Sequence, residues 1–453
     1  MIEVFWEQAI RFGLFWGIWL LVPLLVDVST AMVYFISFLS NKKRKEEKTE
    51  ELNYFPYVTI VVPVHNSEDT LYACLRSIAR QTYPRDCMQL ICVNNGSEDN
   101  SFAVFQRFQE EYTTMAVSWT AVERAGKSIA LNAGMYSGHG SYMMNVDADV
   151  WLDREAVMNV VKTFEKDSSL AAATGSVRVD KKIGEGSTVL DIINYCEIIE
   201  YIVAFDVGRR YQDLKNSIFT LSGAFSVFRR DIILQSFLYQ TRTVSEDTDL
   251  TFNIRKAIQD SGGRIGFIAD AIAYVEPIES MSRLYSQRVR WQRGEIEVTG
   301  VYYDKVPGIR EALGDFVGRI LISDHTLSFL RLAWTFLLPF LYFLGYPLPT
   351  LLVALMGMFV CYLVLETCTY AIAYKGAEEH YKKGLKKIWW IVFFMPIYRY
   401  LSYWFRLAGI IMVLTEEKSW KVENPVTQLA DILGQYIKLM KGSVLSVRKW
   451  LKS

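Results

Sequence analysis

Residues 142–149 read YMMNVDAD, a largely apolar run that ends in two aspartates separated by a single alanine. A short run of this kind, closed by polar residues, is typical of a strand buried in a parallel sheet. Asp147 and Asp149 would then stand at the carboxyl end of the strand, where open α/β sheets bind their ligands. The stretch therefore predicts a fold class and the position of a site within it.

Two stretches upstream have the same character. Residues 58–62 (VTIVV) and 90–93 (LICV) are short apolar runs that each end in polar turn residues. Residues 68–81, between them, carry apolar residues at helical spacing. Strands and helices that alternate in this way indicate an α/β domain with a parallel sheet. We therefore expect a Rossmann-like α/β fold over residues 53–306.

Long apolar segments lie on both sides of that domain. Residues 10–39, 328–345 and 350–374 are each long enough to cross a bilayer, which takes roughly 17–25 helical residues. The first segment lacks a cleavage-site pattern, which favours a retained helix over a signal peptide. The basic cluster at residues 41–48 (NKKRKEEK) places the following domain in the cytoplasm.

A fourth apolar stretch, residues 388–414, is interrupted by Pro396. It either crosses the membrane or bends at the proline and lies partly at headgroup level. The basic loop at residues 382–387 (KKGLKK) is consistent with a return of the chain to the cytoplasm. We expect three membrane spans, or four if this stretch crosses.

The chain divides accordingly into four predicted parts. Residues 1–52 hold the first membrane helix and a basic linker, and residues 53–306 hold the α/β domain. Residues 307–415 hold interfacial and membrane helices, and residues 416–453 hold an amphipathic tail.

Composition narrows the class of protein. Lys+Arg and Asp+Glu each number 49, so the formal net charge is zero and no basic excess indicates nucleic-acid binding. Apolar residues make up 51% of the chain, unevenly distributed. The six cysteines form no CxxC pair, and reduced thiols in a cytosolic setting are the simplest interpretation.

Asp147 and Asp149 are candidate metal ligands. Two carboxylates one residue apart at a strand end can share Mg²⁺ or Mn²⁺ with a diphosphate, because these cations favour oxygen ligands and substrate phosphates. The alternative is an acidic pair at a helix start, since residues 153–164 also have a helical pattern and carboxylates are favoured there.

Glu246 and Asp247 begin a second acidic stretch, residues 245–249 (SEDTD), just before a predicted helix. Asp247 can deprotonate an acceptor hydroxyl if it is held within hydrogen-bond reach. The alternative is a capping box, in which Thr243 and Glu246 have the required spacing.

Residues 287–291 (QRVRW) form the third candidate. In a helix, Gln287, Arg290 and Trp291 lie on one face, because they are three or four residues apart. Arginine can clamp a phosphate, tryptophan can stack on a sugar ring and glutamine can hydrogen-bond through its amide. The alternative is a basic amphipathic helix that lies against the membrane.

Taken together, these motifs resemble those of the membrane-embedded family 2 glycosyltransferases, which include the cellulose, hyaluronan and poly-N-acetylglucosamine synthases. In that family an Asp is followed by DxD, (E/T)D and QxxRW in a cytoplasmic GT-A domain between membrane helices. The motifs of this chain follow the same order, and the resemblance covers about residues 54–300.

The resemblance implies an inverting, metal-dependent hexosyl transfer from a UDP-sugar. Asp147 and Asp149 would hold the metal and diphosphate, and Asp247 would act as the base, with Glu246 beside it. Gln287, Arg290 and Trp291 would lie by the diphosphate and the acceptor. Further candidates are Lys127, within KSIALN at residues 127–132, for the donor, and Ser222 and Gly223, within LSGAFS at residues 221–226, for the acceptor.

The end of the second predicted strand departs from the family. Asn94 and Asn95 stand where the family usually carries an Asp that contacts uracil. An amide still hydrogen-bonds a base edge, but a charge is lost, so the donor half of the site differs. Asn95 and the preceding loop, with His65, Asn66 and Glu68, are the expected nucleotide pocket, and His65 alone is equally compatible with a structural turn.

Three functions are compatible with these features. The first is a processive synthase that makes a polysaccharide from UDP-glucose or UDP-N-acetylglucosamine and secretes it. The second is transfer of a single sugar to a membrane lipid. The third is a silent subunit that binds nucleotide or polymer, which only Asn94 and Asn95 favour. The expected setting is a bacterial plasma membrane, with the bilayer, a UDP-sugar, a polysaccharide and accessory secretion proteins as partners.

Overall fold

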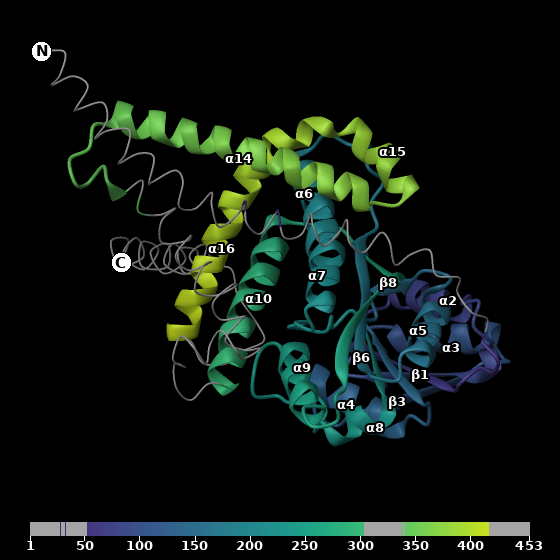
Figure 1. Cartoon of the computed structure of the whole chain (residues 1–453). Helices are drawn as coiled ribbons and strands as arrows, with labels where there is room; N and C mark the ends of the chain where they lie inside the picture. The colour runs from purple at the N-terminus through teal and green to yellow at the C-terminus, as the bar shows by residue number, and fades with distance from the viewer. Residues whose placement is uncertain (1–27, 29–31, 33–51, 303–336, 338–339, 416–453) are drawn as a thin grey trace, which may run out of the picture.

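The computed structural model describes residues 28, 32, 52–302, 337 and 340–415 (Figure 1). The predicted spans 10–39 and 328–345 therefore lie wholly or mostly outside the described residues, as do the basic cluster 41–48 and the tail 416–453. The predicted domain end at residue 306 also lies outside them, so that boundary stays a prediction.

The core of the domain is one mixed sheet of eight strands in the order β3-β2-β1-β4-β7-β6-β8-β5. β1, β2, β3 and β4 pair in parallel, and β7 is antiparallel to both of its neighbours. The strands are β1 (Val58–Val64), β2 (Met88–Asn94), β3 (Ala116–Ala121), β4 (Tyr142–Val146), β5 (Val150–Leu152), β6 (Leu170–Val179), β7 (Phe225–Arg229) and β8 (Arg264–Val275).

Helices cover both faces of this sheet. The described helical segments of the domain are α2 (Leu71–Ala79), η2 (Arg85–Cys87), α3 (Ser101–Glu111), α4 (Lys127–Ser137), α5 (Ala156–Lys166), α6 (Val189–Ile202), the π-helical turn η3 (Val203–Val207), α7 (Gly208–Leu214), α8 (Arg230–Gln235), α9 (Glu246–Ala257) and α10 (Met281–Tyr302). The α/β prediction is confirmed, and the antiparallel strands make the sheet mixed rather than wholly parallel.

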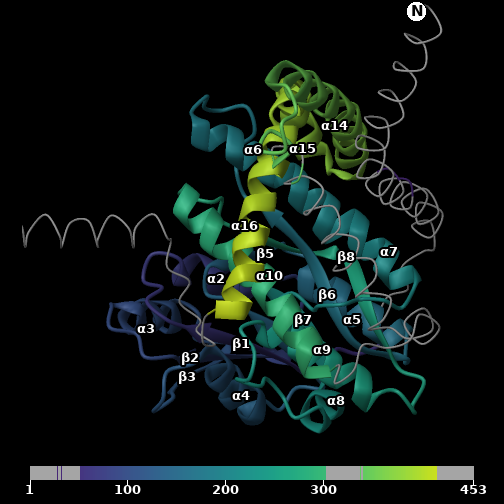
Figure 2. The ribbon, with the colours of Figure 1, turned by 90° about the vertical axis from the view of Figure 1, so that its left-hand side faces the viewer.

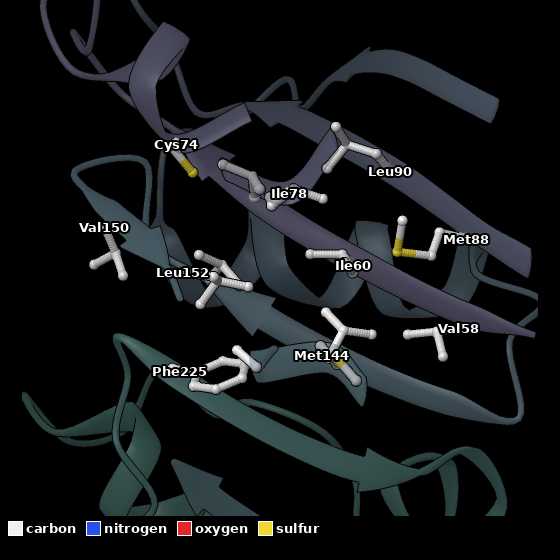
Figure 3. Packing of buried hydrophobic residues seen from close by; sticks show 14 of the residues in the cluster. Val58, Ile60, Cys74, Ile78, Met88, Leu90, Met144, Val150, Leu152 and Phe225 are labelled. Carbon is white, nitrogen blue, oxygen red and sulfur yellow. The ribbon is translucent and has the colours of Figure 1, made fainter. Parts of the chain in front are cut away.

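Successive side chains of a strand point to opposite faces of the sheet, so the core has two layers, one on each face. Val58, Ile60 and Val62 of β1 face one layer, in which α2, α3 and α5 pack, and Val61 faces the other, in which α4, α8 and α9 pack. Figure 3 shows the first layer, where side chains of β1, β2 and β4 meet those of α2 and β7. Because both faces are covered, β1 reads as a continuous apolar run.

Four further helical segments follow the domain: α14 (Leu348–Gly376), α15 (Glu379–Lys387), η5 (Trp389–Phe393) and α16 (Met395–Thr415). Within the described residues, α14 is the one helix whose length and composition suit a membrane crossing. It contains the predicted span 350–374 and leads away from the sheet in Figure 1. Its apolar side chains near the amino end, such as Leu352, Val353 and Met356, are exposed.

The predicted stretch 388–414 is divided into two helical segments. The break lies before Pro396, since η5 ends at Phe393 and α16 begins at Met395. Proline is tolerated there because the first turn of a helix has no internal partner for its N–H group. α16 runs beside α10 in both views (Figures 1 and 2).

The C-terminal helices dock on the domain through a shared core. Tyr381 and Leu385 of α15 are buried with residues of β6, α6 and α16, and the Tyr381 hydroxyl donates to the Val179 carbonyl at 2.9 Å. Arg399 of α16 pairs with the buried Glu366 of α14. The basic loop predicted at residues 382–387 is therefore part of a helix held against the domain.

One glycine shows how closely the first helix of the site approaches the sheet. A Cβ atom at Gly134 of α4 would overlap the side chain of Val61 on β1, whereas one at the exposed Gly300 of α10 would meet nothing within 4 Å. We expect Gly134→Ala to destabilise the protein by about 1–3 kcal/mol through overpacking. Gly300→Ala should be neutral or stabilising by up to about 1 kcal/mol, because alanine favours helices.

Denaturant unfolding of the purified full chain, followed by far-UV circular dichroism, measures both variants. Equal stability of the two variants would contradict this account of α4 packing.

Candidate active site

The candidate site lies at one edge of the sheet. The parallel strands β1, β2 and β4 all end there, and the antiparallel strand β7 begins there. The helices α4 and α9 also start at this edge. Chain direction alone therefore brings together segments that are up to about two hundred residues apart.

Lys127 and Asp147 form the central ion pair. Lys127 is the first residue of α4, and its Nζ lies 2.8 Å from Oδ2 and 2.7 Å from Oδ1 of Asp147, just past β4. Glu246 Oε1, at the start of α9, is 4.0 Å from the same Nζ. The predicted donor lysine and the predicted metal ligand are thus in direct contact.

The charges in this cluster are unevenly balanced. Burial lowers the pKa of Lys127, but the attraction of Asp147, Glu246 and Asp247 outweighs burial and raises it. Burial raises the pKa of Asp147, Lys127 opposes that rise, and Asp149 and Asp247 add to it. The ammonium is therefore firmly protonated among carboxylates whose mutual repulsion is only partly offset.

Asp247 is held by two backbone donors. Its Oδ1 accepts from the Thr248 N–H at 2.9 Å, and its Oδ2 accepts from the Gly223 N–H at 3.1 Å. The alternative of a capping box is wrong, because Ser245 is the N-cap without a side-chain bond and Thr243 donates to its carbonyl. The carboxylate is thus fixed at the site by the start of α9 and the loop before β7.

The loop that contains Ser222 and Gly223 lies on the same carboxylates. A Cβ atom at Gly223 would be 3.2 Å from Asp247 Oδ2 and 3.6 Å from Lys127 Nζ, so a side chain there would crowd the cluster. Asn145, fully buried on β4, donates to the Gly223 carbonyl at 2.6 Å. Asn145 was absent from the predicted site, although a polar residue in an apolar strand was a usable signal.

Asp149 lies beyond the ion pair. Its side chain is exposed and makes no hydrogen bond with the described residues. The strand β5 follows it directly and α5 begins only at Ala156, so the alternative of an acidic pair at a helix start is wrong. Its charge adds to burial in raising the pKa of Glu276.

The loops after β1 and β2 form a connected unit. His65 Nδ1 is 3.0 Å from the Asn95 carbonyl, and Glu68 Oε2 accepts from the Asn100 N–H at 2.9 Å. Asn66 has φ of 47°, in the left-handed region that asparagine tolerates, and accepts from the Glu98 N–H. The predicted nucleotide-pocket residues therefore lie together, next to the start of α4.

Both asparagines that depart from the family pattern bind backbone groups. Asn94 Oδ1 accepts from the Ser97 N–H at 2.8 Å, and Asn95 Oδ1 accepts from the Gly126 N–H. Asn95 thus connects the end of β2 to the residue that precedes Lys127. The amide oxygens shape the loop, and the remaining NH₂ groups are donors.

The helix α10 carries the third motif. Arg290 approaches the carboxylates: burial lowers its pKa, and Glu246, Asp147 and Asp247 counteract that effect. Gln287 Nε2 lies 3.5 Å from the Tyr201 hydroxyl of α6, on the side to which Trp291 also points. Within this motif, Arg290 interacts electrostatically with the carboxylates, while Gln287 and Trp291 lie near Tyr201 of α6.

The arginines of α10 do not form a membrane-facing stripe. Arg288 and Arg293 are buried and pair with Glu200 and Glu297 at 2.7 and 2.8 Å. The alternative of a basic amphipathic helix against the membrane is wrong for these residues, because they are buried and each forms an ion pair with a glutamate of the protein.

A family model for glycosyl transferase family 2 matches residues 59–237. This region contains the loops after β1, β2 and β4 together with the loop before β7.

Curated relatives are similar over a comparable region. Poly-beta-1,6-N-acetyl-D-glucosamine synthase of Staphylococcus aureus strain MSSA476 is 28% identical over 241 residues, which are 53% of this chain and 55% of the relative. The same enzyme of Staphylococcus epidermidis is also 28% identical, with the same coverage. The chain thus spans about half the length of the curated relatives that it matches.

A solved structure shares the fold. A mannosyltransferase from Pyrobaculum calidifontis, in complex with GDP-Man and Mn²⁺, aligns with a TM-score of 0.54 and 17% identity. The alignment covers 88% of this chain and 99% of the other. At this identity the likeness concerns the fold alone.

The ion pair predicts a specific energetic coupling. We expect Lys127→Gln to destabilise the protein because it leaves the Asp147 carboxylate among other acids, and Asp147→Asn to destabilise it by leaving Lys127 without its closest partner. The double variant should lose less unfolding free energy than the two single variants together, with a coupling of roughly 1–3 kcal/mol.

Denaturant unfolding of the four proteins gives the coupling. The exposed pair of Lys382 and Glu379 on α15 is a matched control, and its Gln variants should show a coupling below about 1 kcal/mol. Coupling of equal size in both pairs would contradict a special role for the site pair.

Proposed function

We propose that the chain is an inverting glycosyltransferase of family 2, whose family model matches residues 59–237, and that it builds a polysaccharide at a membrane. We propose UDP-N-acetylglucosamine as its donor. The similarity to poly-beta-1,6-N-acetyl-D-glucosamine synthases supports this choice over UDP-glucose.

The observation that carries the proposal is the meeting of Lys127, Asp147, Gly223 and Asp247 at the ends of β4 and β7. Cations there suit a diphosphate, and a carboxylate fixed by backbone donors suits a general base. The cation that binds the diphosphate and the carboxylate that acts as base must lie on either side of one sugar ring. The Gly223 loop lies between Lys127 and Asp247.

The residues then have the following roles. Asp247 accepts the proton of the acceptor hydroxyl as its oxygen attacks the anomeric carbon. The bond from that carbon to the diphosphate breaks on the opposite side, and the nucleoside diphosphate leaves with the electron pair. Lys127 and Arg290 offset the charge that develops on the diphosphate. Glu246, next to the ammonium, holds Lys127 in place.

Asp147 and Asp149 fit a divalent cation. No group of three or more His, Cys, Asp or Glu side chains in the described part of the chain has metal-site geometry. Yet Asp149 is an exposed carboxylate with no hydrogen bond to any residue that the structure describes, and its charge helps to raise the pKa of Asp147. Carboxylate oxygens with excess negative charge are suitable ligands for Mg²⁺ or Mn²⁺. The diphosphate would supply the remaining ligands of the cation. When bound, the cation would offset charge on the leaving group.

The loops after β1 and β2 are proposed to bind the nucleotide. His65, Asn66 and Glu68 lie beside Asn95, whose NH₂ group donates to an acceptor such as a uracil carbonyl oxygen. The acceptor is proposed to lie against Ser222, Gly223, Gln287 and Trp291. Tryptophan offers a flat apolar face to a sugar ring.

The membrane setting rests on α14. We propose that this helix crosses the bilayer, with its exposed apolar end in lipid and its other end docked on the domain with α15. Further spans at residues 10–39 and 328–345, and a cytoplasmic domain in a bacterial plasma membrane, belong to the same proposal.

Product analysis tests the function. The purified full chain, given radiolabelled UDP-N-acetylglucosamine with Mn²⁺, should yield a product of many sugar units on a gel. Asp247→Asn should lower its synthesis by at least about 10²-fold, because a general base contributes that much, while UDP binding is retained.

Labelled UDP-glucose is the donor control. A product that carries one sugar on a lipid would contradict polymer synthesis and indicate lipid glycosylation as the function. No transfer from either donor by a chain that binds UDP would support the silent-subunit alternative.

Metal binding gives a test that does not need activity. Mn²⁺ together with UDP should raise the thermal midpoint of the wild type, as any ligand of the native state does. Asp149→Asn should lose most of this shift, because it removes a charged ligand from an exposed position. Asp86→Asn, in η2 just before the amino end of β2 and thus at the opposite end of that strand from the site, is the control and should keep it. An undiminished shift in Asp149→Asn would exclude this residue as a ligand.

A further inference from the structure

Three helices meet at a polar cluster behind the third motif. We use the name three-helix cluster for Glu200 of α6, Arg288 of α10 and Tyr398 of α16. Arg288 Nη2 donates to Glu200 Oε2 at 2.7 Å and lies 3.2 Å from the Tyr398 hydroxyl. That hydroxyl donates to the same Glu200 oxygen at 2.8 Å. The cluster is therefore a closed triangle with one corner on each helix.

Trp291 lies directly against this cluster. The Arg288 guanidinium carbon is 4.3 Å from the centroid of the Trp291 ring, which is close contact for a cation above an aromatic face. Tyr201 and Phe205, from α6 and η3, surround the indole with ring centroids at 6.4 and 5.9 Å. Trp291 is half-buried, so part of its surface stays open.

Arg288 is poorly satisfied as a purely structural ion pair. Its side chain is 6% exposed, and its Nε and Nη1 are buried without a hydrogen-bond partner among the residues that the structure describes. A buried donor left without a partner is unfavourable. Hydrogen bonds alone therefore do not account for the position of this side chain, whose guanidinium carbon lies 4.3 Å from the Trp291 ring centroid.

The surrounding charges keep Arg288 ionised. Burial works against its charge, but the attraction of Glu200 outweighs burial and raises its pKa. Glu197 of α6 also faces it: burial raises the pKa of Glu197 to about 7, and Arg288 opposes that rise. The cluster therefore keeps one permanent cation above the indole.

We propose that Arg288 is a positioning residue that sets the angle and depth of the Trp291 ring for the acceptor sugar. We further propose that Tyr398 couples α16 to this ring through Arg288 and Glu200. The inference rests on the proposed function, in which Trp291 stacks on the acceptor. Its new content is that a helix next to the membrane helix α14 controls the acceptor face of the site.

Lysine cannot replace arginine in this arrangement. A guanidinium is planar, so it can stack on a ring and at the same time donate hydrogen bonds in its own plane. An ammonium is a point charge and cannot combine the two. Arg288→Lys keeps the charge and removes the stacking. Tyr398→Phe keeps the ring packing and removes only the hydroxyl of the triangle.

Steady-state kinetics of the purified full chain test the proposal. The acceptor is a soluble oligosaccharide obtained by partial hydrolysis of the wild-type product, and the donor is varied separately. Tyr398→Phe should raise the acceptor KM about fivefold and Arg288→Lys roughly 10- to 100-fold, because the first change removes one hydroxyl from the cluster and the second removes the guanidinium that contacts the Trp291 ring. The donor KM should change less than about twofold in both, because Lys127 and Asp247 are untouched.

Tyr400→Phe is the matched control. Tyr400 lies on the same helix two residues away, is 39% exposed and has its ring against Trp404 rather than Trp291, so its variant should behave as wild type. A double variant, Arg288→Lys with Tyr398→Phe, should raise the acceptor KM by less than the product of the single effects, because both act on one ring.

Two results would overturn the inference. One is an unchanged acceptor KM in both single variants; the other is an equal rise of the donor and acceptor KM, which would indicate a general structural role. Either result leaves the proposed function standing if the wild type makes polymer. A wild type that transfers no sugar would instead remove the proposed function and this inference with it.

Discussion

Electrostatic repulsion at one edge of the sheet is the constraint on which the site depends. The carboxylates of Asp147, Asp149, Glu246 and Asp247 are brought together by strand and helix ends, and burial makes their repulsion stronger. Lys127 offsets part of it through direct contact with Asp147. Because α4 places this ammonium, the close packing of α4 on β1 is a condition for the site. The charge that stays uncompensated is what a cation bound with the donor would balance.

The helix α10 connects this cluster to the rest of the molecule. Arg290 interacts electrostatically with the carboxylates, Arg288 joins α6 and α16, and Trp291 lies against Arg288. α16 is in turn paired with α14 through Arg399 and Glu366. The proposed donor side of the site therefore rests on the sheet, and the proposed acceptor side rests on helices that continue toward the proposed membrane span. This division suits an enzyme whose donor is soluble and whose product leaves through a membrane.

Local patterns in the sequence were sufficient for much of the domain. Tyr142–Val146 is a strand with the predicted limits, and the helix that follows β1 was expected, although α2 is shorter than residues 68–81. β5 was missed, because three residues are too few for a periodic pattern to be recognised. The antiparallel direction of β7 was also missed, since direction depends on the path of the chain and not on composition. Asn145 was overlooked although its amide in an otherwise apolar strand was a signal, because its partner, the Gly223 carbonyl, lies in a loop 78 residues away.

The sequence by itself determined the α/β class, the order of the acidic motifs and the α14 helix, because each depends on neighbouring residues or on a short period. It also brought Asp147, Asp247, Arg290 and Trp291 into one candidate set through the family resemblance. Only the tertiary structure decided that Lys127 neutralises Asp147 and that Glu200, Arg288 and Tyr398 form one cluster. Glu200 and Tyr398 are 198 residues apart. Contacts over such distances depend on how helices pack, and no local pattern records them.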